Sequence, residues 1–280
     1  MRPHARGTAV CVLAAVLACA CAGNVPPPNA TERQASALNQ RAARAFEQGD
    51  YRRAAALYEQ ALRLDAAVEN TDGIAANALS LARAWQAAGD TAAAHRALET
   101  VLAEGPLAFA PSQRAEAQAR KAQLYLDAGD AVGARRWTEA ALASCADCAA
   151  LPAIQALRGR AALAAADHVS ALEWAAKALA AAGEGQPGER ANALRLLGEA
   201  RIAGGEHQAA IAPLEQALAL DRNLGRPALI CRDLMALGQA HLKLGDRPRA
   251  LAYFSRAKSV SAAAGDVAGA RAASQAMEGL

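Results

Sequence analysis

The chain has 280 residues, of which 54% are hydrophobic but only 4% are aromatic. Alanine dominates, whereas the β-branched and aromatic side chains that fill sheets are scarce. The composition therefore predicts an all-α protein without one thick globular core. The formal net charge of +3 comes from 30 basic and 27 acidic residues. Because the sequence contains no long run of Lys and Arg, nucleic acid is not a predicted partner.

Residues 1–20 have the features of a secretory signal. Residues 1–6 are basic, residues 7–18 are uncharged and apolar, and small residues and cysteines follow. The apolar stretch of 12 residues is short for a membrane span, which needs about 20; a buried first helix is the alternative. Removing Arg2 and Arg6 with this segment would leave 28 basic and 27 acidic residues, a net charge of +1.

The end of this segment resembles a bacterial lipoprotein signal, in which small and apolar residues precede a cysteine that becomes acylated. Cys21 is the preferred lipidation site, because residues 22–24 would then open a flexible segment, and Cys19 is the alternative. The resemblance implies a lipid anchor, at roughly 0.8 kcal/mol per buried methylene group. Since no aspartate directly follows either cysteine, it also implies the outer membrane of the bacterial cell envelope, facing the periplasm.

Residues 21–34 are predicted to form a tether between the membrane and a folded module. This segment is polar and contains three consecutive prolines at 26–28, which favour a solvated polyproline-like conformation. At ~3.1 Å per residue such a spacer reaches on the order of 40 Å.

The rest of the chain contains an internal repeat. A small residue followed by an acid marks the tip of each predicted helical hairpin, because glycine can end one helix in the left-handed conformation and an acid can cap the next. The six copies are Gly49-Asp50, Gly89-Asp90, Gly129-Asp130, Ala166-Asp167, Gly205-Glu206 and Gly245-Asp246. After each tip comes an alanine at a fixed distance: Ala54, Ala94, Ala134, Ala171, Ala210 and Ala250. Seven residues later comes another small residue: Ala61, Val101, Ala141, Ala178, Ala217 and Ala257.

This pattern resembles the tetratricopeptide repeat. The best copy begins at Cys231 and carries Leu234, Leu237, Gly238, His241, Ala250, Phe254 and Ala257 at the characteristic positions. Starts fall near 35, 75, 115, 152, 191 and 231. The resemblance implies an α-solenoid of about six helix-turn-helix repeats over 35–262, with a period of 37–40 residues and a C-terminal capping helix in 263–280. The period is longer than the usual 34, and Pro213 is expected to kink a helix.

The sequence lacks the signatures of catalysis, which favours a protein that is not an enzyme. Histidines are dispersed over different repeats, and no nucleophile, metalloprotease or phosphate-binding fingerprint occurs. No cofactor, metal or small-molecule substrate is therefore expected. The one local signal is Cys145 and Cys148, in a CxxC arrangement. It is interpreted as a structural disulfide of an oxidising compartment, with a thiol-disulfide redox pair and half of a zinc site as the alternatives.

In the tetratricopeptide family the first helix of each hairpin lines a concave groove. Mapping the family's groove positions onto this sequence gives Asn39, Arg83, Gln86, Gln123, Asp127, Arg160, Arg195, Glu199, Arg232, Gln239 and Lys243. Several of these arginines could pair with the carboxylates of an extended peptide, and a merely solvated face is the alternative. The Lys and Asn pattern by which chaperone-type repeats bind a C-terminal carboxylate is not reproduced.

The resemblances together imply a membrane-tethered periplasmic scaffold or adaptor that binds protein or peptide partners during assembly of an envelope machine. A pilotin-like assembly factor for a type IV pilus or secretion secretin is the alternative of the same class. A redox protein that uses Cys145 and Cys148 is the alternative of another class.

Overall fold

The computed structural model describes residues 29–280, and every regular element in this part of the chain is an α-helix. The thirteen helices are α1 (Ala30–Glu47), α2 (Tyr51–Ala67), α3 (Thr71–Ala87), α4 (Thr91–Leu102), α5 (Pro111–Asp127), α6 (Ala131–Ser144), α7 (Leu151–Ala164), α8 (His168–Ala182), α9 (Pro187–Ala203), α10 (His207–Asn223), α11 (Pro227–Lys243), α12 (Arg247–Ala263) and α13 (Val267–Glu278).

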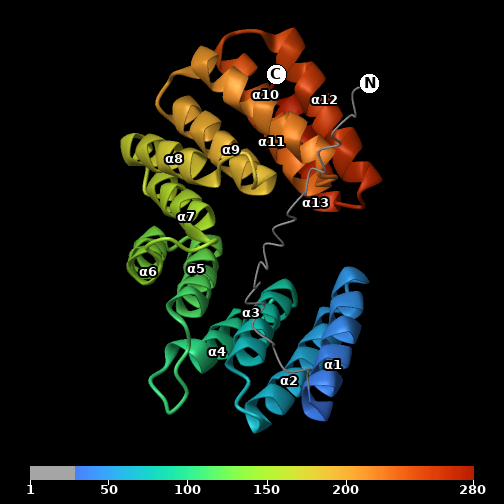
Figure 1. Cartoon of the computed structure of the whole chain (residues 1–280). Coiled ribbons are helices and arrows are strands. Elements are labelled where there is room, and N and C mark those ends of the chain that lie inside the picture. The colour runs from blue at the N-terminus through green and yellow to red at the C-terminus, as the bar shows by residue number, and fades with distance from the viewer. Residues whose placement is uncertain (1–28) are drawn as a thin grey trace, which may run out of the picture.

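The helices form six successive hairpins, from α1–α2 to α11–α12, and α13 packs against the last of them. Each helix contacts mainly its neighbours in the chain, as expected when every repeat packs only on the next one. Figure 1 shows the hairpins following one another along an arc, from blue α1 to red α13. The predicted all-α solenoid of about six repeats with a capping helix is confirmed.

The hairpin tips have the local geometry that the repeat pattern predicts. Gly49 has a φ of 79°, in the left-handed region that glycine adopts without strain. Asp50 follows it, and its side chain accepts a hydrogen bond from the backbone N–H of Arg53 at 3.2 Å, capping α2. At the fourth tip Ala166 takes the left-handed conformation with a φ of 60°. Glu206 makes no side-chain cap of α10.

The core is a thin ribbon of small side chains between closely packed helices. All twelve small residues that the repeat pattern singles out after the tips are 0% exposed. Gly238 shows why size matters at these positions, because a Cβ atom added there would lie 2.4 Å from Cε1 of Phe254. Large side chains of the second helix thus fill the space that a small residue of the first helix leaves open.

The first helix begins earlier than predicted. The Asn29 side chain accepts from the backbone N–H of Glu32 at 2.9 Å, and the Glu32 carboxylate accepts from the Asn29 N–H at 2.7 Å. This capping box starts α1 at Ala30, so residues 30–34 are helical rather than part of a tether. The predicted signal, the rest of the tether, Cys19 and Cys21 lie outside the described residues.

Prolines start several of the later hairpins. Helices α5, α9 and α11 begin at Pro111, Pro187 and Pro227, four residues before the repeat starts at 115, 191 and 231. Proline is favoured at the first helical position because its ring fixes φ and its missing N–H would have no intrahelical partner.

Helix α10 continues through Pro213 from His207 to Asn223. Proline has no N–H to donate to the carbonyl four residues earlier, which belongs to Ala209. Arg201 of α9 replaces that donor, because its Nη1 donates to the Ala209 carbonyl at 2.6 Å. The neighbouring helix of the same hairpin thus satisfies the backbone group that Pro213 leaves free.

Candidate functional site

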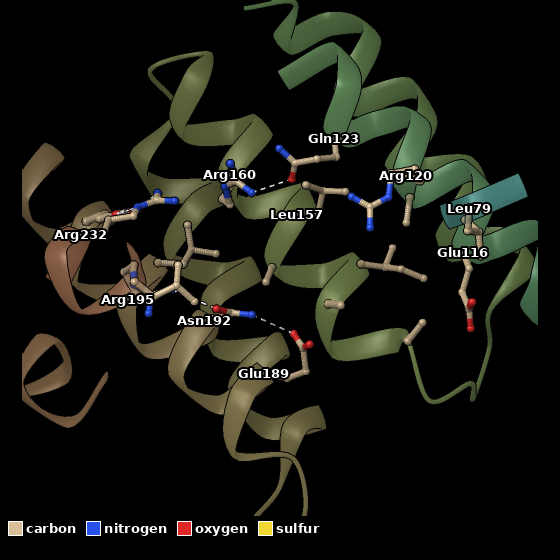
Figure 2. Close-up of a pocket in the computed structure, with 18 residues that line it drawn as sticks. Leu79, Glu116, Arg120, Gln123, Leu157, Arg160, Glu189, Asn192, Arg195 and Arg232 are labelled. Carbon is tan, nitrogen blue, oxygen red and sulfur yellow. Dashed lines mark hydrogen bonds and ion pairs between the residues drawn. The ribbon is translucent and has the colours of Figure 1, made fainter. Parts of the chain in front are cut away.

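A cavity of about 460 Å³ opens on the inner face of the arc, where the first helices of successive hairpins lie side by side (Figure 2). Its wall includes residues of α3, α5, α7, α9 and α11. The polar lining residues are Glu116, Arg120, Gln123, Arg160, Glu189, Asn192, Arg195, Glu199 and Arg232. The apolar ones are Leu79, Ala119, Ala150, Ala153, Ile154, Ala156, Leu157, Leu196 and Leu229.

The structure brings part of the predicted groove together in this cavity. The predicted residues that line it are Gln123, Arg160, Arg195, Glu199 and Arg232, whereas Asn39, Arg83, Gln86, Asp127, Gln239 and Lys243 lie outside it. Glu116 and Arg120 also line the cavity, although neither was predicted from the sequence. A helical signal could have found them, since Glu116, Arg120, Gln123 and Asp127 recur every three or four residues on one face of α5.

A ladder of hydrogen bonds joins the first helices of three hairpins across the groove. Asp127 of α5 accepts from the Nε2 atoms of both Gln86 of α3 and Gln123 of α5, the latter at 2.6 Å. Gln123 in turn accepts through Oε1 from Nη1 of Arg160 of α7 at 2.8 Å. This polar ladder holds the side chains in fixed positions, which preorganises the surface for a ligand.

A bidentate ion pair bounds the groove on the side of the C-terminal hairpins. The guanidinium of Arg232 on α11 donates through Nε and Nη2 to the two carboxylate oxygens of Glu199 on α9, at 2.7 and 2.8 Å. Burial opposes the charged form of Arg232, but the Glu199 carboxylate outweighs it and raises the pKa of Arg232. Each charge is therefore largely neutralised by the other.

Arg195 has a structural role that its place in the repeat did not predict. It is 3% exposed, and its Nε donates to Oδ1 of Asp233 at 2.6 Å, while its Nη2 is paired with Asp221. Asp221 also accepts from Nε of Arg226 at 2.6 Å. This buried ion network joins α9, α10 and α11. Burial raises the pKa of Asp233 to about 7, with Arg195 opposing the shift.

Arg120 and Arg160 differ from the other arginines of the cavity. Within residues 29–280, Arg120 has no hydrogen-bond or ion-pair partner, and Arg160 is bonded only to the neutral amide of Gln123. Burial lowers the pKa of both guanidinium groups. The positive charge of Arg83 acts in the same direction on Arg120, and that of Arg232 on Arg160. The carboxylate of Asp127 opposes both shifts, and that of Glu199 also opposes the shift of Arg160. Neither carboxylate forms an ion pair with Arg120 or Arg160, so the two guanidinium groups form a positive site in the cavity wall that lacks a direct acidic partner.

The two cysteines of the CxxC arrangement are bonded to each other in the structure. Cys145 is the residue that follows α6, and Cys148 lies in the turn before α7. The Cys145 side chain is 2% exposed and packs with Ala115, Ala141 and Ile154. Since Ile154 also lines the cavity, the disulfide fixes the turn from which one wall of the groove begins.

Residues 29–280 contain neither a candidate metal site nor a candidate membrane span. In this part of the chain, no group of three or more His, Cys, Asp and Glu side chains could hold a metal ion. Nor does any of the thirteen helices have the length and apolar composition of a membrane span.

The architecture is similar to that of known proteins with tetratricopeptide-like repeats. A tetratricopeptide-repeat family model matches residues 37–71, which cover most of the first hairpin. None of the curated proteins matches the chain. Among solved structures, the nearly identical TPR-like repeats of a Podosopora anserina protein are 23% identical, with a TM-score of 0.55, and the match covers 71% of this chain and all of that one.

Two further structures are similar over most of this chain. BtubC from P. vanneervenii is 21% identical with a TM-score of 0.58, over 85% of this chain and 93% of its own. A Rap protein complexed with Competence and Sporulation Factor is 12% identical with a TM-score of 0.59, over 82% of this chain and 66% of its own. The fold therefore defines an α-solenoid. More specifically, the chain is a tetratricopeptide-repeat-like solenoid, and its first hairpin carries the recognisable family sequence.

Proposed function

We propose that this protein is a non-enzymatic scaffold that binds an extended segment of a protein partner in its inner groove. The observation that carries the proposal is the cavity, which combines apolar walls with fixed hydrogen-bonding side chains from five helices. Curved solenoids present such extended concave surfaces to their partners. The similarly folded Rap protein was crystallised in complex with Competence and Sporulation Factor, which supports the proposal.

Site-specific photocrosslinking tests the proposed groove. A photoreactive phenylalanine is placed at Ala153 of α7, which lines the cavity, or at Ala176 of α8, which is exposed outside it. We expect a crosslinked partner from position 153 and none from position 176. Crosslinking from position 176 alone would show that the partner binds the outer face and would refute the proposed groove.

The proposed place of action is the bacterial cell envelope, with a lipid on Cys21, or on Cys19, anchoring the protein at the outer membrane facing the periplasm. The support is the sequence pattern of residues 1–24, and a lipid anchor would confine the scaffold to the membrane surface. Partitioning of the full chain into the detergent phase tests this. The Cys19→Ala/Cys21→Ala variant should move to the aqueous phase, and unchanged partitioning would contradict the lipid anchor.

Two alternatives remain predictions from the sequence. A pilotin-like role would use the same anchor with a pilus or secretion secretin as partner, so identification of the crosslinked protein decides it. A redox role would need access to the Cys145–Cys148 disulfide. Cys145 is 2% exposed, which is unfavourable for attack on its sulfur by an external thiolate, whereas Cys148 is partly exposed.

A further inference from the structure

Among the four arginines of the cavity, Arg120 and Arg160 are the two that form no ion pair with a carboxylate of the described residues. The other two have acidic partners, since Arg195 pairs with Asp221 and Asp233, and Arg232 pairs with Glu199. In Figure 2, Arg120 and Arg160 lie on either side of Leu157, with Gln123 beside them. Two guanidinium groups from α5 and α7 thus occupy the same wall of the cavity.

Arg120 and Arg160 are both partly buried, so the absence of an ion-pair partner has an energetic cost. A guanidinium that loses water without gaining a carboxylate loses solvation energy, and a bound anion would restore it. The lowered pKa values of both side chains have this physical cause, with burial as the largest contribution. The site is therefore more complementary to an anion than to water alone.

The acidic side chains of the cavity do not supply this anion. Glu116 is one helical turn before Arg120 on α5, yet the two form no ion pair, and Figure 2 shows the Glu116 carboxylate pointing away from Arg120. Glu189 lies on α9 and accepts from Nδ2 of Asn192 at 3.3 Å. Asp127 is near enough to raise the pKa of both groups, but its oxygens accept from Gln86 and Gln123, and it forms no ion pair with either arginine. A carboxylate in direct contact with both guanidinium groups would therefore come from a bound partner.

We propose that Arg120 and Arg160 bind the carboxylate of an aspartate or glutamate side chain within the partner's extended segment. This inference rests on the proposed function. An internal side chain fits better than a chain terminus because polar groups lie on both sides of the two arginines. Gln86 and Asp127 lie toward α3, and Glu199 and Arg232 lie toward α11. The segment can therefore run on in both directions from the bound acid.

Peptide selection tests the assignment. Purified wild-type chain, lipid-free, is screened against a random library of N-acetylated, C-amidated dodecapeptides, and the selected sequences are resynthesised with Glu or Gln at each acidic position. We expect the selected peptides to share one acidic position. Changing that residue from Glu to Gln should weaken binding to the wild-type chain about 10- to 100-fold, which is the range for a hydrogen bond to a charged group. The Arg120→Gln/Arg160→Gln variant should bind both peptides about equally.

A matched variant controls for the loss of two positive charges. Arg52 on α2 and Arg96 on α4 are exposed, so Arg52→Gln/Arg96→Gln should retain the preference for Glu. Selection of peptides without an acidic preference, or a preference that survives in Arg120→Gln/Arg160→Gln, would overturn this inference and leave groove binding intact. A requirement for a free C-terminal carboxylate in a second library would overturn the side-chain assignment. Failure to select any peptide would count against the proposed function as well.

Discussion

Replacing Asp233 with asparagine tests how the buried ion network between α9, α10 and α11 makes stability depend on pH. Asp233 is 0% exposed, and its Oδ2 atom has no hydrogen-bond partner. The charged groups near it are Arg195, which donates to its Oδ1 atom at 2.6 Å, Asp221, which also pairs with Arg195, and the neighbouring Arg232. Burial raises the pKa of Asp233 to about 7 from the ordinary value of 3.8, so the folded chain binds this proton more tightly than the unfolded chain does.

The sign and size of the effect follow from linkage. Because the pKa is raised on folding, the stabilisation is fully present below about pH 4 and is lost as the pH rises through 7. At about 1.4 kcal/mol per pKa unit the whole change is on the order of 4 kcal/mol. About 2–3 kcal/mol of it falls between pH 5 and pH 8. Asparagine is neutral at both pH values and can still accept from Arg195, so Asp233→Asn should lose this part of the pH dependence.

The assay is urea unfolding at pH 5 and pH 8, followed by circular dichroism. Hydrogen exchange of the α11 amides reports the same transition locally, since the repeats of a solenoid need not unfold together. Glu173→Gln, at an exposed position of α8, is the control and should keep the wild-type pH dependence. If Asp233→Asn loses as much stability between pH 5 and pH 8 as the wild type, the reasoning about Asp233 is refuted.

Two other predictions concern packing and the disulfide. Gly238→Ala would place Cβ 2.4 Å from the buried Phe254 ring. Overpacking costs about 1–3 kcal/mol and should exceed the gain of about 1 kcal/mol in helix propensity, so thermal unfolding should show a lower Tm. Gly185→Ala, in open space, is the control, and equal Tm values for the two variants would contradict close packing at Gly238. Cys145→Ser/Cys148→Ser should lower the free energy of unfolding by about 2 kcal/mol, the entropy estimate for so short a loop. Thiol titration of the wild type should find both cysteines unreactive without reductant, and ready reduction of the folded chain would favour the redox alternative.

Much of the fold could be predicted from the sequence because it depends on local preferences and spacing. The left-handed glycine and the capping aspartate, as in Gly49-Asp50, fix each hairpin tip within a few residues of chain. The small residues that follow, such as Ala54 and Ala61, then identify the face on which the helices meet. Helix starts were predicted less well, since interior positions defined the repeat and the capping box of Asn29 and Glu32 was missed.

The candidate site was less predictable from the sequence than the fold, because it depends more on the tertiary structure. Repeat position alone assigned Arg195 to a groove surface, but the fold buries it against Asp221 and Asp233, which lie 26 and 38 residues away in the chain. The curvature of the arc decides which groups of α5, α7 and α9 share one cavity. Only the assembled cavity therefore shows that Arg120 and Arg160 form no ion pair with a carboxylate of the described part of the chain. The sequence by itself determined the hairpins, because their signals are local. The distribution of charge in the groove was decided by packing between hairpins, because it depends on distances between residues far apart in the chain.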